Sequence, residues 1–392
     1  MSLVTFFAET FVGSLKKQGE ELCGDTVEVV RTGDALIMVL ADGLGSGVKA
    51  SILSTLTSKI AASMLRQGAS VDEVVATLAG TLPVCKVRGL AYSTFLIVSV
   101  NLKGREAYLV EYDCPDTFVI RKGQLLPVTK SVRTISGKEI AEARFPIEEN
   151  DLFILASDGV LHAGEGGILN LGWQWEHVAH YLEKQASQSP ELPELVQTLL
   201  AVCDNLYLRR PGDDVTVAGL RIRRSEQVTL LAGPPSDCRD DASIVEYLLA
   251  QPGKKVVCGG TTAQVVSRVS GRPLLTTMDQ PVEGVPPTAE MPGLDLVTEG
   301  VLTLSRALQL IRMAKDQSNF GRNAAHLDGS DGASRLARLL LFECTAVRIL
   351  LGGAENAAHR DLADRVLPRK QVVEAICNEL RQMGKQVELS YC

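Results

Sequence analysis

Residues 1–224 show the apolar pattern of a strand-rich domain interrupted by helices. Apolar residues there form short runs or alternate with polar ones between turn residues, which is typical of β-strands. The predicted strands cover residues 4–11, 26–31, 35–41, 93–101, 106–112, 117–121, 151–157 and 215–223. Apolar residues spaced by four instead predict helices over 48–65, 71–82 and a helical pair within 175–206. We therefore expect an α+β fold, an αββα sandwich of two antiparallel sheets flanked by helices.

The pattern changes after residue 224, where a polar stretch precedes the turn-rich segment 233–237. We predict a first domain over 1–224, a linker over 225–240 and a second domain over 241–392. In the second domain strands alternate with helices, which is typical of a small α/β domain with a parallel sheet. Its predicted strands are 255–258, 294–297, 347–351 and 387–391, and its predicted helices are 261–269, 303–315, 332–343 and 369–383. The Pro-rich segment 281–292 and the Gly-rich segment 317–332 are predicted to be mobile loops.

Composition excludes several classes of protein. The chain is 45% apolar without any run long enough to span a bilayer, so we expect a globular protein with no membrane partner. Its net charge is -7 and it has no basic stripe with interleaved aromatic residues, which argues against a nucleic-acid partner. The N-terminus has no basic region and is interpreted as a first strand. Nine scattered cysteines without a Cys-x-x-Cys pair indicate reduced thiols and a cytoplasmic location.

Candidate chemistry is concentrated in four short acidic motifs that each adjoin an apolar strand. They are Cys23-Gly24-Asp25, Asp42-Gly43-Leu44-Gly45-Ser46-Gly47, Ser157-Asp158-Gly159 and Gly212-Asp213-Asp214-Val215-Thr216. Carboxylates gathered at the ends of neighbouring strands would repel one another unless divalent cations supplied the compensating charge. Because all the candidate ligands are oxygens, Mg²⁺ or Mn²⁺ suits them better than Zn²⁺.

Each motif also has a simpler interpretation. Asp-Gly after a strand is a common turn, and Gly45 to Ala50 fits the G-x-G-x-x-A pattern of a dinucleotide-binding loop. That loop requires an acidic residue at the end of the next strand, whereas residues 65–70 are Leu-Arg-Gln-Gly-Ala-Ser at a helix end. The motifs occurring together and in this order favour the metal site. Either Asp213 or Asp214 could be the ligand while the other caps the turn.

The order and spacing of these motifs resemble the metal-dependent protein serine/threonine phosphatases of the PPM family. They are similar specifically to the bacterial branch that resembles the stage II sporulation protein E phosphatase and the stressosome feedback phosphatase. The resemblance covers residues 1–224, and D-G-x-G-x-G followed by S-D-G and D-D-x-T is a specific combination. It implies that Asp42 bridges two Mn²⁺ or Mg²⁺ ions and that the Gly43 carbonyl binds one of them. It further implies that Asp158 and Asp213 complete the other ion's shell, and that Asp25 holds metal-bound water or joins a ligand set.

The same resemblance implies a function. The expected reaction is hydrolysis of phosphoserine or phosphothreonine on a bacterial regulatory protein, such as an anti-sigma-factor antagonist or a stressosome component. The phosphate-binding arginine of eukaryotic-type members is absent, since Glu20 stands in its place. The alternative is a catalytically weak binding or scaffold protein whose C-terminal domain senses a ligand or partner, or forms a homodimer. The presence of all four aspartates favours the enzyme.

Other polar residues near the motifs have two interpretations each. His162 follows Asp158 by four residues and is either a proton donor to the leaving group or an ordinary loop histidine. His177 and His180 are interpreted as packing or surface residues. Ser46 and Lys49 could touch phosphate, but a helix cap and a solvated lysine are favoured.

A second candidate site lies in the C-terminal domain. A Gly-Gly-Thr-Thr turn after a predicted strand is either a tight turn with a threonine cap, which we favour, or the start of a helix that binds an anion. Glu299 ends another predicted strand, so both segments could line one crevice at the carboxyl edge of the sheet. The candidate ligand site comprises Gly259, Gly260, Thr261, Thr262 and Glu299.

Overall fold

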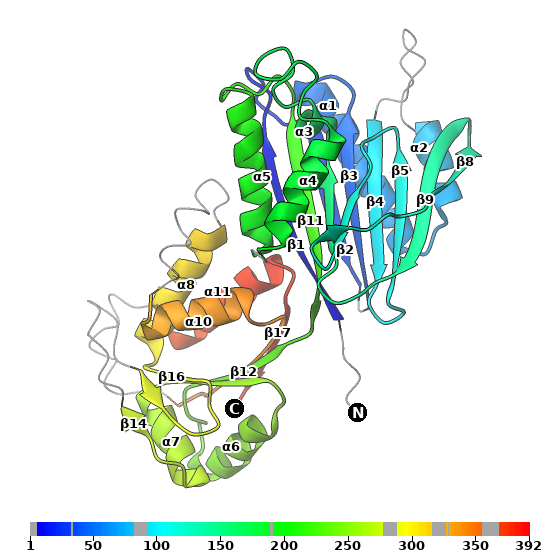
Figure 1. Cartoon of the computed structure of the whole chain (residues 1–392). Coiled ribbons are helices and arrows are strands. Elements are labelled where there is room, and N and C mark those ends of the chain that lie inside the picture. The colour runs from blue at the N-terminus through cyan, green and yellow to red at the C-terminus, as the bar shows by residue number, and fades with distance from the viewer. Residues whose placement is uncertain are drawn as a thin grey trace. The chain divides into compact units, whose positions relative to one another are not determined.

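The computed structural model of the chain comprises two compact units, residues 1–224 and 225–392 (Figure 1). The structure describes residues 6–32, 34–81, 93–188, 191–276, 288–315, 327, 329–354 and 368–392. No helix in these ranges is both long and apolar enough to span a bilayer.

The N-terminal unit contains two antiparallel sheets. The five strands of the first sheet lie in the order β1 (Phe6–Leu15), β11 (Val215–Arg224), β10 (Leu152–Ala156), β6 (Phe118–Arg121) and β7 (Gln124–Leu125). The six strands of the second lie in the order β2 (Asp25–Arg31), β3 (Ala35–Gly43), β4 (Ser93–Asn101), β5 (Glu106–Tyr112), β9 (Lys138–Pro146) and β8 (Ser131–Ile135). Each of the eight strands predicted in this unit is present.

Helices cover the outer faces of both sheets, which confirms the predicted αββα sandwich. Helices α1 (Gly47–Arg66) and α2 (Val71–Thr81) pack on the second sheet, while α4 (Trp175–Ala186) and α5 (Leu192–Leu206) pack on the first (Figure 1). Strand β3 shows why the central strands are continuously apolar. Met38 and Leu40 face the core between the sheets, and Ile37 and Val39 face the helices, so both sides are buried.

The sequence pattern missed β7, the hairpin of β8 and β9, and the one-turn helix α3 (Asp158–Leu161). Strand β8 lies at the edge of its sheet and is exposed along most of its length, so it lacks the apolar alternation by which strands are predicted. Its turn at Ser136 and Gly137 has positive φ at both residues, the geometry of a two-residue hairpin.

The C-terminal unit contains one seven-stranded sheet. Its strand order is β14 (Leu275–Thr276), β15 (Ala289–Glu290), β16 (Leu296–Thr298), β13 (Lys254–Cys258), β12 (Gln227–Ala232), β17 (Ala346–Leu351) and β18 (Gln386–Tyr391). The prediction of a parallel sheet is corrected, because β14 and β15 pair antiparallel at one edge while the other five strands are parallel. The helices are α6 (Asp241–Ala250), α7 (Gly260–Ser270), α8 (Val301–Lys315), α10 (Gly332–Phe342) and α11 (Arg369–Gln382).

The predicted linker over residues 225–240 is also corrected. Strand β12 lies inside it, pairs in parallel with both β13 and β17, and buries Val228, Leu230 and Leu231. The polar residues between β11 and β12 obscured the strand in the sequence, because they resemble the start of a loop. Most of the two predicted mobile loops, 281–292 and 317–332, lies outside the described residues.

We predict that fragments 1–224 and 225–392 each fold alone, because each has its own hydrophobic core. Both should unfold cooperatively in thermal denaturation followed by circular dichroism. A fragment of residues 241–392 is the matched control. It lacks β12 from the middle of its sheet and should show no cooperative transition. Cooperative unfolding of 241–392 equal to that of 225–392 would contradict the assignment of β12.

Candidate active site

Two of the predicted aspartates lie opposite each other in the second sheet. Asp25 is the first residue of β2 and pairs with Asp42, the penultimate residue of β3. Side chains paired in this way lie about 5 Å apart at Cβ, where like charges destabilise a sheet. The Ser93 hydroxyl donates to the Asp42 carbonyl over 2.9 Å and so fixes the end of β3 against β4. The hairpin register therefore concentrates negative charge at one end of this sheet.

The other two motifs come from the first sheet and are tied to each other. Ser157 follows β10, and its hydroxyl accepts a hydrogen bond of 2.9 Å from the Thr216 backbone N–H in β11. The Ser157 N–H donates in return to the Thr216 carbonyl over 3.0 Å. At Gly159 a Cβ would lie 2.1 Å from the Asp214 carbonyl oxygen, so only glycine permits this approach. These contacts hold Asp158, the first residue of α3, beside the loop that carries the third motif.

Asp213 and Asp214 have different surroundings. The Asp214 carboxylate is buried and accepts hydrogen bonds from the backbone N–H groups of Lys17, over 3.0 Å, and Gly24, over 2.9 Å. The Asp213 side chain is 43% exposed, and Lys17 Nζ lies 3.7 Å from its Oδ1. The Asp214 carboxylate thus links its own loop to the segments that contain Lys17 and Gly24. Asp213 is the more accessible carboxylate of the two.

Burial and mutual repulsion perturb the titration of this cluster. Burial, together with the charges of Asp25, Asp158 and Asp213, raises the pKa of Asp42 to about 9. Burial likewise raises the pKa of Asp25 to about 6, although hydrogen bonds to Thr216 oppose the rise. The pKa of Asp158 is raised by burial and by Asp213. The four aspartates from the two sheets therefore lie within electrostatic range of one another.

The chemistry of these residues fits a divalent cation. The buried Oδ2 of Asp25 has no hydrogen-bond partner, and the carboxylates around it supply hard oxygen donors. Across the described part of the chain, no three His, Cys, Asp or Glu side chains already converge in metal-binding geometry. The carboxylates are thus gathered without forming a closed ligand shell. Asp25, Asp42, Asp158 and Asp213, with the Gly43 carbonyl, are the groups that would hold an ion there.

The glycine-rich loop is held by a residue to which the sequence assigned no role. Glu20 Oε1 accepts a 2.8 Å hydrogen bond from the Ser46 hydroxyl. A Cβ on Gly47, which has φ of +66°, would lie 2.3 Å from Glu20 Oε2. Ser46 occupies the N-cap position of α1, as predicted, but its hydroxyl donates to Glu20 and makes no cap hydrogen bond. Lys49 is exposed, as expected for a solvated lysine.

The predicted histidines lie at the surface. His162 Nδ1 is 2.6 Å from Glu165 Oε2, and the ring lies close enough to Asp158 to oppose in part the rise that burial and Asp213 cause in the pKa of that carboxyl. His177 Nδ1 is 3.0 Å from the Trp173 carbonyl oxygen, and His180 is solvent-exposed. His162 is therefore the histidine that the fold places beside the acidic cluster.

In the C-terminal unit, the fold brings together the two segments of the predicted ligand site. Gly259 precedes α7 with φ of +127°, and its N–H donates over 2.9 Å to the Thr298 carbonyl, next to Glu299. Gly260 and Thr261 begin the helix, and Thr261 is exposed. The favoured threonine cap is not formed, because α7 has no side-chain cap hydrogen bond and the Thr262 hydroxyl donates to the Cys258 carbonyl. Ligand binding at this turn stays a prediction.

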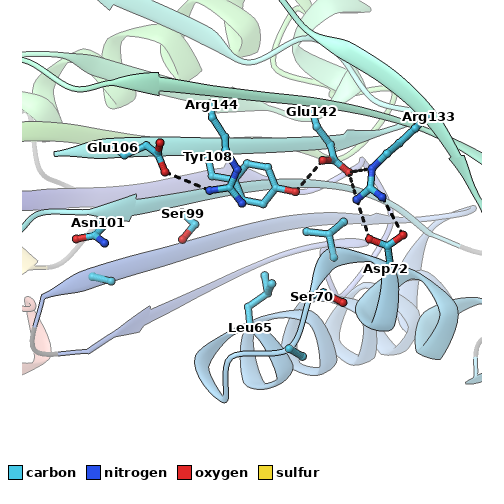
Figure 2. A pocket seen from close by; sticks show the side chains of 13 residues that line it. Leu65, Ser70, Asp72, Ser99, Asn101, Glu106, Tyr108, Arg133, Glu142 and Arg144 are labelled. Carbon is cyan, nitrogen blue, oxygen red and sulfur yellow. Dashed lines mark hydrogen bonds and ion pairs between the residues drawn. The ribbon is translucent and has the colours of Figure 1, made fainter. Parts of the chain in front are cut away.

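A pocket of about 520 Å³ lies between the end of α1, the start of α2 and the outer face of the second sheet (Figure 2). It is at the opposite end of α1 from the glycine-rich loop, roughly 30 Å away at 1.5 Å per residue. Arg133 pairs with both Asp72 and Glu142, and Arg144 pairs with Glu106. The Arg133–Asp72 pair joins α2 to the sheet, and the acidic motifs are not among the lining residues.

The sequence comparisons concern the N-terminal unit. Residues 32–223 match the family described as Stage II sporulation protein E (SpoIIE). No curated protein matches the chain.

Among solved structures, the phosphatase domain of SpoIIE from Bacillus subtilis is similar at 19% identity and a TM-score of 0.43, covering 57% of this chain and 95% of its own. The PP2C domain of SiaA from Pseudomonas aeruginosa is similar at 20% identity and a TM-score of 0.44. The match covers 54% of this chain and 85% of the SiaA domain. RsbX in complex with magnesium is similar at 20% identity and a TM-score of 0.39. The match covers 56% of this chain and 100% of RsbX. The matched residues contain three of the four acidic motifs in the expected order, and residues 32–223 of the N-terminal unit are therefore a PP2C-type serine/threonine phosphatase domain of the SpoIIE family.

Proposed function

We propose that the N-terminal unit hydrolyses phosphoserine or phosphothreonine on a regulatory protein and uses two Mg²⁺ or Mn²⁺ ions to do so. The observation that carries this proposal is the convergence of four mutually repelling aspartates, one of which has a buried oxygen without a partner. A phosphatase of this family would use such a cluster to hold cations, because the ions offset the repulsion that folding creates. The family resemblance suggests an anti-sigma-factor antagonist or a stressosome component as the substrate.

Individual side chains have distinct tasks in this proposal. When bound, a pair of divalent cations lowers the pKa of water and offsets charge on a phosphoryl group. Asp25, Asp42, Asp158 and Asp213 bind the cations, with the Gly43 carbonyl. Asp214 keeps its loop in place through two backbone donors and stays out of the ligand set.

His162 stands beside Asp158 with its ring held by Glu165. Because Nδ1 faces Glu165, Nε2 is the ring atom left to deliver a proton to the leaving oxygen. Lys17 Nζ, near Asp213, is a cation at the edge of the cluster.

Replacing Asp42 or Asp158 by alanine should lower the kcat for p-nitrophenyl phosphate with Mn²⁺ by about a hundredfold or more, because each change removes an oxygen ligand. Asp116→Ala is the matched control, since this exposed carboxylate pairs with Lys130 and not with the motifs. Its activity should equal that of the wild type. Retention of more than about a tenth of the activity by both motif variants would contradict the proposal.

Metal dependence gives a separate test. Dialysis against EDTA should abolish turnover of p-nitrophenyl phosphate, and Mn²⁺ or Mg²⁺ should restore it, because the donors are hard oxygens. Zn²⁺ should restore little. Turnover that persists after chelation, in protein shown by elemental analysis to be metal-free, would rule out the two-cation mechanism.

The raised pKa of Asp42 predicts how the metal-free protein responds to pH. The unfolded chain loses this proton near pH 3.8, whereas the folded chain keeps it to about pH 9. The contribution to stability is full below pH 3.8 and is lost as the pH rises to 9, since the unfolded state then binds fewer protons.

In EDTA at pH 8, Asp42→Asn should therefore raise the melting temperature by about 2 °C or more relative to wild type. Mn²⁺ should stabilise the wild type and not the variant, because the variant lacks the ligand. Asp116→Asn serves as the control and should leave both responses unchanged. A variant that melts below the wild type in EDTA would show that the charge of Asp42 stabilises the fold.

A further inference from the structure

Helix α1 presents large apolar side chains to solvent. Val48, Ile52 and Leu56 are 56%, 54% and 45% exposed. Their four-residue spacing confines them to a band about 80° wide, and we call these three residues the α1 stripe. Single exposed apolar residues are common on protein surfaces, but a contiguous row of them marks an interaction site.

The stripe is not a by-product of packing, because the residues that α1 buries completely are all small. Ala50, Ser54, Ser58 and Ala61 are fully buried against the second sheet. Thr26 on β2 makes a 2.8 Å hydroxyl contact with Ser54. An amphipathic helix ordinarily buries its large apolar residues and exposes its polar ones. In the first half of α1 Leu53 packs partly against the core, whereas Val48, Ile52 and Leu56 remain exposed, so the fold does not need the stripe.

Charge on α1 indicates what would cover the stripe. The helix carries Lys49, Lys59 and Arg66, all exposed, and no acidic residue, in a chain whose net charge is -7. Lys59 falls within about 20° of Val48 around the helix axis and so continues the same face. An occupant with an apolar stripe flanked by Asp and Glu would complement both features.

The position of the stripe connects it to the acidic cluster. Helix α1 begins at Gly47, four residues after β3 ends with Asp42 and Gly43. Val48 lies one residue into the helix. Leu22 is also exposed, on the segment that Glu20 joins to Ser46. A helix lying along α1 would thus end beside the candidate active site.

We propose that the α1 stripe, together with Lys59 and Arg66, docks an acidic amphipathic helix of the phosphoprotein substrate. This inference rests on the proposed phosphatase function and assigns substrate recognition to a surface outside the metal site. The docked helix orients the phosphoprotein so that its phosphorylated residue reaches the aspartates, which lowers KM without changing the chemical step.

Binding is tested on the full chain with two labelled helical peptides of about 18 residues. Both have one leucine stripe, flanked by glutamates in one peptide and by lysines in the other. Fluorescence anisotropy should show at least about tenfold tighter binding of the glutamate peptide. Ile52→Glu should abolish that binding, and Lys59→Glu should weaken it. Val132→Glu is the matched control, because Val132 is 65% exposed on β8 and lies outside α1. Equal binding of both peptides, or binding unaffected by Ile52→Glu, would overturn the proposal.

Catalysis separates this proposal from the phosphatase assignment. With a phosphoserine appended to the glutamate peptide, Ile52→Glu should lower kcat/KM by about tenfold, whereas turnover of p-nitrophenyl phosphate should be unchanged. Equal kcat/KM in both proteins would overturn docking. Failure of the wild type to hydrolyse p-nitrophenyl phosphate with Mn²⁺ would overturn the phosphatase function, while the anisotropy experiment would still decide docking.

The folded state and the oligomeric state complete the test. Circular dichroism should show that the Ile52→Glu variant has the melting temperature of the wild type. If its melting temperature is lower, the experiments are repeated with the milder Ile52→Ser variant. Analytical ultracentrifugation gives the oligomeric state of both proteins. If the wild type is a dimer and the Ile52→Glu variant is a monomer, the stripe binds a second copy of the chain and the proposal is wrong. A monomer in both proteins supports it.

Discussion

Electrostatic repulsion among carboxylates is the constraint around which the N-terminal unit is organised. The register of β2 and β3 places Asp25 opposite Asp42, and the other sheet adds Asp158 and Asp213. Burying charges of one sign costs free energy unless protons or cations neutralise them. The raised pKa of Asp42 means that this carboxyl keeps its proton at neutral pH, which removes part of the repulsion. In the proposed function, divalent cations offset the same repulsion.

Hydrogen bonds and close backbone approaches hold the cluster together against this repulsion. Asp214 accepts from two backbone N–H groups that are distant in sequence, and Ser157 and Thr216 bridge β10 and β11. Gly159 allows the Asp214 carbonyl to approach more closely than any side chain would permit. The glycines and the second aspartate of these motifs are therefore needed for geometry, while the remaining aspartates supply charge.

The two faces of α1 link this centre to the surface. Small residues let the helix lie close to β2 and β3, the two strands that carry Asp25 and Asp42. The same packing leaves Val48, Ile52 and Leu56 outside the core. One helix can therefore pack on these two strands and offer a partner a surface beside them. The pocket at the other end of α1 is lined by paired charges and has no such continuity with the acidic motifs.

The sequence alone determined the αββα architecture and the acidic motifs, because buried strands need apolar runs and a cation needs oxygen donors at their ends. Residues whose role depends on distant partners were decided only by the tertiary structure. Asp213 and Asp214 are adjacent residues of the same type, so the sequence cannot assign them different roles. The tertiary structure does, because the backbone N–H groups of Lys17 and Gly24 donate to the Asp214 carboxylate. Strand β12 looked like a linker because its place between β13 and β17 is set by pairing with segments far along the chain. The spacing of Ile52 and Leu56 predicted a helix, but the small residues opposite them decided which face the fold would bury.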